Sequence, residues 1–175
     1  MYKEIGVTEY TEEVLKSLSS GAFLTTKHKD VINTMTIGWG GVTIVWGKPI
    51  FIVFVRDSRA THNLLEGSME FTVSVPILNK MTRELNFCGT KSLREFNKFK
   101  ECGLTPLKGR TINTPVIKEA GLHYECKVLY KQILNQNDIN RDVIDKYYNP
   151  LSTNHAIHTV YFGEIVDHYI FEEEK

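Results

Sequence analysis

Cysteine is scarce in this sequence: 175 residues contain only Cys88, Cys102 and Cys126, and no two of them are spaced as CxxC. Such an odd, scattered set builds neither a disulfide framework nor a cysteine zinc site. Long apolar runs are also missing, and the first residues contain neither the basic nor the apolar region of a signal peptide. We therefore expect a reduced, cytoplasmic protein that does not enter a membrane.

An excess of positive charge is absent as well. The 21 lysine and arginine residues balance the 21 aspartate and glutamate residues. Nucleic-acid-binding proteins usually have a basic excess, so we expect no nucleic-acid partner, although a local basic pocket for a small anion stays compatible with this balance. A length of 175 residues with 42% hydrophobic residues fits one domain over residues 1–175.

The common catalytic motifs are missing too. The sequence contains no GxGxxG, no GxxxxGK[ST], no HExxH and no GxSxG, and its six histidines are not spaced as metal ligands. These absences argue against the usual phosphate-binding loops of nucleotide enzymes, against a metalloprotease and against an α/β-hydrolase. We expect no metal site.

Hydrophobic periodicity predicts mostly strands. The predicted strands cover residues 22–28, 31–40, 42–46, 49–55, 70–77, 115–120, 122–134 and 158–171. The predicted helices cover residues 8–21, 58–68, 79–89 and 91–103, and the polar stretch 135–156 is expected to be partly helical. Because the helices do not alternate one by one with the strands, we expect a mainly antiparallel β-barrel with helices at its rim rather than a doubly wound sheet.

The stretch "RDSRATHN" follows the very apolar "FIVFV" and concentrates polar groups. Its guanidinium and hydroxyl side chains, at Arg56, Ser58, Arg59 and Thr61, precede the backbone N–H groups of a helix start. Such a combination suits a phosphate group. A solvated turn in which Ser58 caps the helix is the alternative.

Two further stretches have more than one interpretation. In "CGTKS", residues 88–92, the glycine permits close approach of a ligand and the lysine could meet an anion, but the local sequence favours a helix end followed by a new helix cap. No His–Asp arrangement near Cys88 indicates an activated nucleophile. In "NTMTIGWGG", residues 33–41, the glycines serve either a tight bend or a flat ligand lying against the backbone.

Together, the segments resemble the flavin reductase-like, FMN-binding split-barrel proteins, including flavoredoxin-type members. The matching stretches, in order, are "GAFLTT", "NTMTIGWGGVTIVWGKPIFIVFVRDSRATHNLLE", "FTVSV", "CGTKSLREFNKFKECGLTP", "PVIKEAGLHYECKVLY" and "HTVYFGEIVD", which cover most of residues 21–168. The resemblance implies a six-stranded antiparallel split β-barrel that forms a homodimer and holds FMN noncovalently near the subunit interface.

The resemblance also implies site residues. It places the flavin ring against Asn33, Met35, Thr36 and Trp39, and the phosphate on Arg56, Ser58, Arg59, Thr61 and Asn63. Cys88, Gly89, Ser92 and Lys98 match a family segment that borders the flavin, and His158 matches a histidine on the nicotinamide side. Within that segment Leu93 stands where glycine is usual, and we expect it to narrow the opening or hinder a tight bend.

The function implied is an FMN-dependent oxidoreductase that takes electrons from NAD(P)H and passes them to a flavin, a protein or a small molecule. One alternative is an electron-transfer flavoprotein reduced by a partner redox protein. Another is a binding module for haem or a deazaflavin, with His158 or His123 offered as a haem ligand. The remaining histidines, among them His155, are interpreted as surface or structural residues.

Overall fold

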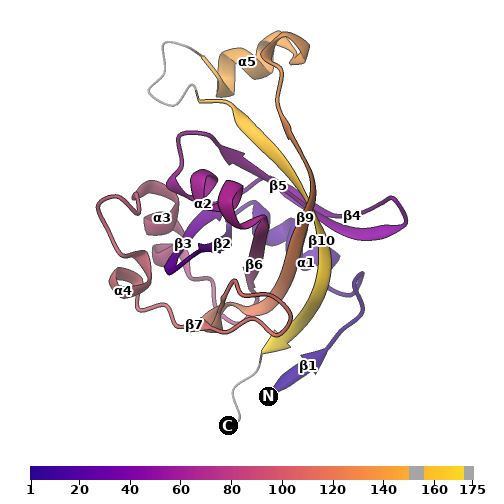
Figure 1. The fold of residues 1–175 in the computed structure, drawn as a ribbon, viewed down its shortest axis with the longest axis vertical. Coiled ribbons are helices and arrows are strands. Elements are labelled where there is room, and N and C mark those ends of the chain that lie inside the picture. The colour runs from indigo at the N-terminus through magenta and orange to yellow at the C-terminus, as the bar shows by residue number, and fades with distance from the viewer. Residues whose placement is uncertain (150–155, 172–175) are drawn as a thin grey trace.

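Strands dominate the computed structural model, which describes residues 1–149 and 156–171 (Figure 1). The strands are β1 (Tyr2–Glu4), β2 (Ala22–His28), β3 (Val31–Ile37), β4 (Gly40–Val45), β5 (Lys48–Arg56), β6 (Glu70–Pro76), β7 (Pro106–Leu107), β8 (Val116–Ile117), β9 (Gly121–Ile133) and β10 (His158–Phe171). The helices are α1 (Thr11–Leu18), α2 (Ala60–Ser68), α3 (Thr82–Thr90), α4 (Lys98–Cys102) and α5 (Arg141–Tyr147), with 3-10 turns at Lys118–Ala120 and Gln136–Asp138. None of the helices in these two ranges has the length and hydrophobicity that a membrane crossing requires. His155 lies outside the described residues.

The large sheet has eight strands, two more than the six that the resemblance implies. Its order is β3-β2-β6-β9-β10-β5-β4, with β1 paired to one end of β10, and these pairings are antiparallel. Strands β7 and β8 form a separate two-stranded sheet. Strands β3 and β4 lie at the two ends of the order, and only Gly38 and Trp39 connect them. The mainly β architecture with peripheral helices confirms the fold class expected from the sequence.

Successive side chains of β2 point to opposite faces of the sheet and contribute to two separate hydrophobic clusters. Ala22 and Leu24 face the larger cluster inside the sheet, whereas Phe23 packs with Leu85 of α3 and Phe99 of α4. Successive side chains of a strand point to opposite faces, so one strand can serve both clusters. Helices α3 and α4 are thereby held against the outer face of β2 and β3. This packing brings polar residues of the two helices, such as Lys98 of α4, next to β3.

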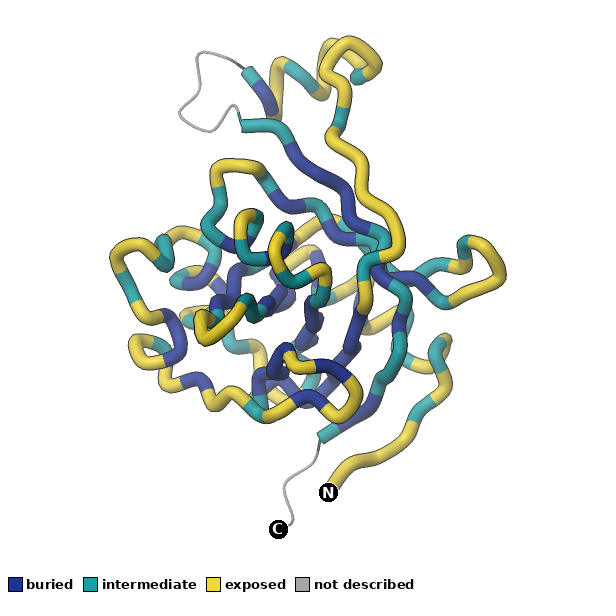
Figure 2. The backbone as a smooth tube through the Cα atoms, viewed as in Figure 1, coloured by how far each residue is buried: buried dark blue, intermediate teal, exposed yellow. Residues whose placement is uncertain are grey.

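Strands β9 and β10 extend beyond the rest of the sheet as a two-stranded arm (Figure 1). Residues 121–126 of β9 are buried against β6, but residues 127–133 are mostly exposed (Figure 2). This outer half pairs with residues 159–164 of β10 and leads to α5 at the far end of the arm. The chain that returns from α5 enters β10 at His158, so α5 lies close to the start of that strand.

Some predicted elements differ from the structure. The helix predicted over residues 91–103 begins only at residue 98, because the Asn97 side chain caps α4 by accepting the backbone N–H of Lys100 at 3.2 Å. The strand predicted over residues 115–120 has two residues and then turns into a 3-10 helix. Residues 88–90 form the last turn of α3 rather than a break between two helices.

The glycines that follow Trp39 serve the chain itself. Gly40 has a φ of +132°, and a Cβ atom there would lie 2.1 Å from the carbonyl oxygen of Ile52 on β5. Only glycine tolerates that contact and that backbone conformation. Of the two interpretations of this stretch, the tight bend therefore accounts for Gly40.

Candidate functional site

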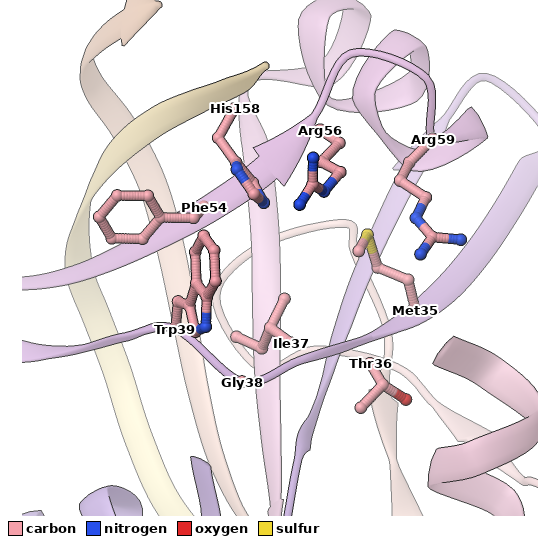
Figure 3. A pocket seen from close by; sticks show the side chains of 9 residues that line it. All are labelled: Met35, Thr36, Ile37, Gly38, Trp39, Phe54, Arg56, Arg59 and His158. Atoms are coloured by element: carbon pink, nitrogen blue, oxygen red, sulfur yellow. The ribbon is translucent and has the colours of Figure 1, made fainter. Parts of the chain in front are cut away.

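Two adjoining hollows lie where β3, β5 and the start of β10 meet. The first, called the aromatic hollow, has a volume of about 190 Å³ and is lined by Met35, Thr36, Ile37, Gly38, Trp39, Phe54, Arg56, Arg59 and His158 (Figure 3). The second, called the basic hollow, has a volume of about 150 Å³ and is lined by Asn33, Met35, Ser58, Arg59, Ala60, Thr61, Lys91, Ser92, Leu93, Arg94 and Lys98. Met35 and Arg59 belong to both, so the hollows form one continuous depression. Together they reach the lower end of the roughly 300–1,000 Å³ that small-molecule sites occupy.

The basic hollow concentrates positive charge in a protein whose net charge is zero. Its lining contains Arg59, Lys91, Arg94 and Lys98 but no carboxylate. The hollow also lies at the first residues of α2, where Arg59 occupies the N-cap position without a capping side-chain hydrogen bond. Backbone N–H groups at a helix start, cations and hydroxyl groups together suit a phosphate.

Two side chains in the basic hollow offer unused hydrogen-bonding capacity. The Asn33 amide donates to Thr61 Oγ1 at 2.8 Å, which leaves the Thr61 hydroxyl hydrogen available. The other amide atom of Asn33, Oδ1, is buried and has no partner among the described residues. Buried acceptors are rarely left unpaired, so Oδ1 suits a ligand hydroxyl or N–H group.

Lys98 connects the helices to β3 beneath the basic hollow. The side chain is 4% exposed, and its Nζ donates to the carbonyl oxygens of Thr34 and Cys88, each at 2.9 Å. Burial lowers the pKa of Lys98 to about 8. The ammonium is therefore mostly protonated at neutral pH and keeps one N–H for a ligand.

Cys88 contributes its backbone carbonyl rather than its thiol. The residue is 1% exposed and lies in the cluster between β2 and the helices. Burial raises the pKa of the Cys88 thiol to about 12. A buried, protonated thiol is a poor nucleophile, which agrees with the lack of an activating pair in the sequence.

Aromatic rings line one side of the aromatic hollow. The Trp39 ring lies 4.7 Å from the ring of His158, 5.1 Å from Tyr147 and 6.2 Å from Phe54, measured between centroids. His158 Nδ1 is 2.8 Å from the hydroxyl of Tyr148, the residue that follows α5. Burial, together with the nearby Arg56 and Arg59, lowers the pKa of His158 to about 4. His158 is therefore a neutral imidazole at physiological pH.

Arg56 differs from the phosphate-binding role that the sequence suggests. Its guanidinium donates to the carbonyl oxygens of Tyr147 and Ala156 and lies 5.2 Å from the centre of the Tyr148 ring. It lines the aromatic hollow and not the basic one. Arg56 holds together the two chain segments on either side of residues 150–155.

Most of the site residues predicted from the sequence line one or both hollows. Those in the aromatic hollow are Met35, Thr36, Trp39, Arg56, Arg59 and His158, and those in the basic hollow are Asn33, Met35, Ser58, Arg59, Thr61, Ser92 and Lys98. Ser58 lines the basic hollow but does not cap α2.

Asn63, Cys88 and Gly89 line neither hollow. Asn63 is exposed on α2. A Cβ atom on Gly89 would lie 3.2 Å from Cβ of Thr36, so the glycine at this position permits close packing of α3 on β3. His123, the other histidine considered as a haem ligand, is fully buried and lies outside both hollows.

Several residues of the site escaped the sequence analysis. Phe54, which lines the aromatic hollow, could have been found from strand alternation, since it faces away from the buried Val53 and Val55. Tyr147 and Tyr148 line neither hollow but contact Trp39 and His158, and they had no local signal because they lie in a polar stretch distant in sequence from the rest of the site. Within the described residues, no group of three or more His, Cys, Asp and Glu side chains is arranged to hold a metal ion.

Comparison with known proteins identifies the class. The family model described as the flavin reductase like domain matches residues 16–175 of this chain. The chain therefore belongs to the flavin reductase-like family, as the resemblance in the sequence indicates.

Individual proteins resemble this chain in sequence or in fold. An uncharacterised protein of Pyrococcus abyssi is 36% identical over 102 residues, which cover 58% of this chain and 56% of the relative. This chain spans about half the length of the curated relatives that it matches.

Among solved structures, flavoredoxin of Desulfovibrio vulgaris (Miyazaki F) has a TM-score of 0.66 at 22% identity, covering 87% of this chain and 69% of that one. An FMN-binding domain of a flavin reductase-like enzyme from Shewanella baltica has a TM-score of 0.66 at 14% identity, covering 97% of this chain and 77% of that one. At these identities the two structures show a shared fold.

Proposed function

We propose that this protein is an FMN-binding oxidoreductase that accepts electrons from NAD(P)H and passes them to a flavin, a protein or a small molecule. The observation that carries the proposal is the pairing of a basic hollow with an aromatic one in a single depression, in a chain of the flavin reductase-like family. FMN has a phosphate at one end and a flat ring system at the other. When bound, FMN would supply the redox chemistry that the side chains lack.

The residues of the basic hollow fit the phosphate and ribityl parts of FMN. Arg59, Lys98 and the free hydroxyl hydrogen of Thr61 would hold the phosphate, with the N–H groups at the start of α2. The unpartnered Asn33 Oδ1 has no proton to give and would accept a hydrogen bond from a ribityl hydroxyl. Met35, which lines both hollows, marks the passage between them.

The residues of the aromatic hollow fit a flat ring. Thr36 and Trp39 come from the end strand β3 and its connection to β4, where one strand edge has no strand partner among the described residues. Backbone N–H and C=O groups on such an edge can pair with the polar rim of a ring. His158 and Trp39 would exclude water on the side from which a nicotinamide ring approaches.

An electron-transfer role without NAD(P)H is the second candidate. Leu93 lines the basic hollow at a position where the family usually has glycine, and its bulk would narrow the space for a second nucleotide. The flavoredoxin of Desulfovibrio vulgaris has the same fold, which supports considering a protein as electron donor. In this alternative a partner redox protein reduces the bound FMN.

One anaerobic experiment separates these functions. The purified protein is reconstituted with FMN, and the visible flavin band is followed during addition of NADH, NADPH or dithionite. Bleaching by a nicotinamide nucleotide at a rate far above that of free FMN is the result expected. Bleaching by dithionite alone would favour the electron-transfer role. Failure to bind FMN would contradict both functions.

We further propose that a second copy of this chain covers an exposed apolar patch formed by Ile44, Trp46, Tyr130 and Phe162. Ile44 and Trp46 are each 61% exposed, and the Trp46 ring lies 6.2 Å from Tyr130 and 6.1 Å from Phe162. Large exposed aromatic groups of this kind are typical of protein interfaces. Strand β5, in contrast, is paired with a strand on each side, and Ile50, Phe51, Val53 and Val55 are buried, so "PIFIVFV" contributes less to this surface than the sequence suggests.

Replacing Trp46 with glutamate is expected to convert a dimer into a monomer. A buried charge in the centre of an apolar interface costs several kcal/mol when it has no partner. Light scattering coupled to size exclusion would measure the mass of the variant. The matched control is Leu15→Glu on α1, an equally exposed leucine (64%) outside the patch, which should leave the mass unchanged. A wild-type protein that is monomeric at all concentrations would contradict the proposal.

A further inference from the structure

We propose that Tyr148 positions His158 as a neutral imidazole with its proton on Nε2, so that the aromatic hollow presents an N–H donor to a carbonyl oxygen of the electron donor or acceptor. The carbonyl class includes carboxamides, aldehydes, ketones and quinones. The assignment to an electron donor or acceptor rests on the proposed function, whereas the state of the imidazole does not.

The hydrogen bond between the two rings determines which nitrogen bears the proton. The Tyr148 hydroxyl lies 2.8 Å from His158 Nδ1, and this is its only hydrogen bond in the part of the chain that the structure describes. The buried Tyr148 hydroxyl has no other acceptor among the described residues, so its hydrogen is satisfied only when the hydroxyl donates to Nδ1. Nδ1 therefore accepts, and the proton of the neutral imidazole resides on Nε2.

The Nε2 atom is available to a ligand. His158 is 7% exposed and lines the aromatic hollow, and Figure 3 shows its ring directed towards the hollow beside Trp39 and Arg56. Within the described residues, Nε2 has no hydrogen-bond partner, and it is not among the side-chain atoms buried without a partner. An unpaired N–H at the wall of a hollow that combines apolar and cationic side chains suits an acceptor oxygen such as that of a carbonyl group.

Burial keeps the His158 ring neutral, and nearby positive charges add to this effect. These charges belong to Arg56 at the end of β5 and Arg59 before α2. Tyr148 faces it from the α5 side, and Trp39 packs on it from the β3–β4 connection. No carboxylate lines the aromatic hollow, so no nearby negative charge opposes this effect.

Tyr148 is itself held firmly in place. It is 2% exposed, and the Arg56 guanidinium lies 5.2 Å from its ring centre while donating to the carbonyl oxygen of Tyr147 at 3.0 Å. The donor that orients His158 therefore comes from a segment fixed to the end of β5. Tyr148 touches His158 through its hydroxyl and is a positioning residue, while His158 contacts the ligand.

Nuclear magnetic resonance of protein labelled with 15N-histidine tests the imidazole directly, without any activity. The wild-type protein should show His158 with its proton on Nε2 and with titration only near pH 4. In Tyr148→Phe the hydrogen bond that keeps the proton off Nδ1 is lost, so part of the His158 population should have its proton on Nδ1, while burial and the two arginines still hold the His158 pKa low. Tyr147→Phe is the matched control, since the Tyr147 hydroxyl has no hydrogen bond among the described residues. This variant should leave the position of the His158 proton and the His158 pKa unchanged. A proton on Nδ1 in the wild type, or an unchanged Tyr148→Phe spectrum, would overturn the proposal.

Titration with nicotinamide tests the carbonyl preference in the same sample. The His158 Nε2–H signal should shift on adding nicotinamide and shift much less with thionicotinamide, in which sulfur replaces the carbonyl oxygen. Equal shifts, or none at tens of millimolar nicotinamide, would overturn the carbonyl assignment. If Tyr148→Phe does not fold, the tautomer of His158 in the wild-type protein and the nicotinamide titration still test the proposal. A correct tautomer in a protein that does not oxidise NAD(P)H would refute the proposed reductase function and leave this inference standing.

Discussion

Replacing Arg59 with alanine is expected to weaken FMN binding by about 10- to 100-fold, the effect of losing a charge-assisted hydrogen bond of about 1.5–3 kcal/mol. Arg59 lines both hollows, and its guanidinium has no ion pair or hydrogen bond in the part of the chain that the structure describes. Its removal should therefore cost little folding free energy. The loss would appear almost entirely in the affinity for the phosphate-bearing ligand.

Quenching of flavin fluorescence during titration would measure that affinity. The matched control is Arg83→Ala on α3, which removes the same charge from a residue outside both hollows and should leave the affinity unchanged. Riboflavin, which lacks the phosphate, should bind Arg59→Ala and wild type almost equally. Equal FMN affinity of Arg59→Ala and Arg83→Ala would show that the phosphate lies elsewhere.

Replacing Glu125 with glutamine is expected to lower the free energy of unfolding by about 3 kcal/mol, because buried donors lose their acceptor. Glu125 is fully buried on β9 and accepts the backbone N–H groups of Arg110, Thr111 and Ile112 at 2.6–2.9 Å. It also accepts the Tyr169 hydroxyl at 2.8 Å. A glutamine of the same shape presents an NH₂ group to some of these donors, so at least one hydrogen bond becomes a contact between two donors.

Thermal unfolding would measure the change. A loss of this size corresponds to a fall of about 6–12 °C in Tm for a domain of 150–250 residues. Glu119→Gln is the matched control, since the Glu119 carboxylate accepts from the single backbone N–H of Thr105 and should cost about 1 kcal/mol or less. Equal Tm values for the two variants would mean that the loop over residues 109–112 is held by other contacts.

Local patterns account for many of the predicted residues that line the two hollows. Arg59 and Thr61 follow an apolar strand and begin a helix, and the positions of strand ends and helix starts depend mainly on neighbouring residues. The order of the segments from residue 21 to 168 was sufficient to indicate the family. These features need no information about residues far away in the chain.

Residues whose contacts differ from the sequence-based expectation depend on distant partners. Arg56 has the right charge for a phosphate, but it is occupied by carbonyl groups 91 and 100 residues further along the chain. Gly40 has the conformational freedom that a ligand contact would need, yet the carbonyl oxygen of Ile52 is what requires it. Neither contact leaves a signature in the neighbouring sequence.

The sequence by itself determined the family, the mainly β composition and most of the side chains of the two hollows, because hydrophobic periodicity and motif order are local properties. Only the tertiary structure decided how these side chains are used. It brought Asn33 to Thr61 and left one amide oxygen unpaired, and it placed Tyr148 behind His158. Such contacts depend on how the strands and the α5 segment pack together, and a pattern along the chain does not encode that geometry.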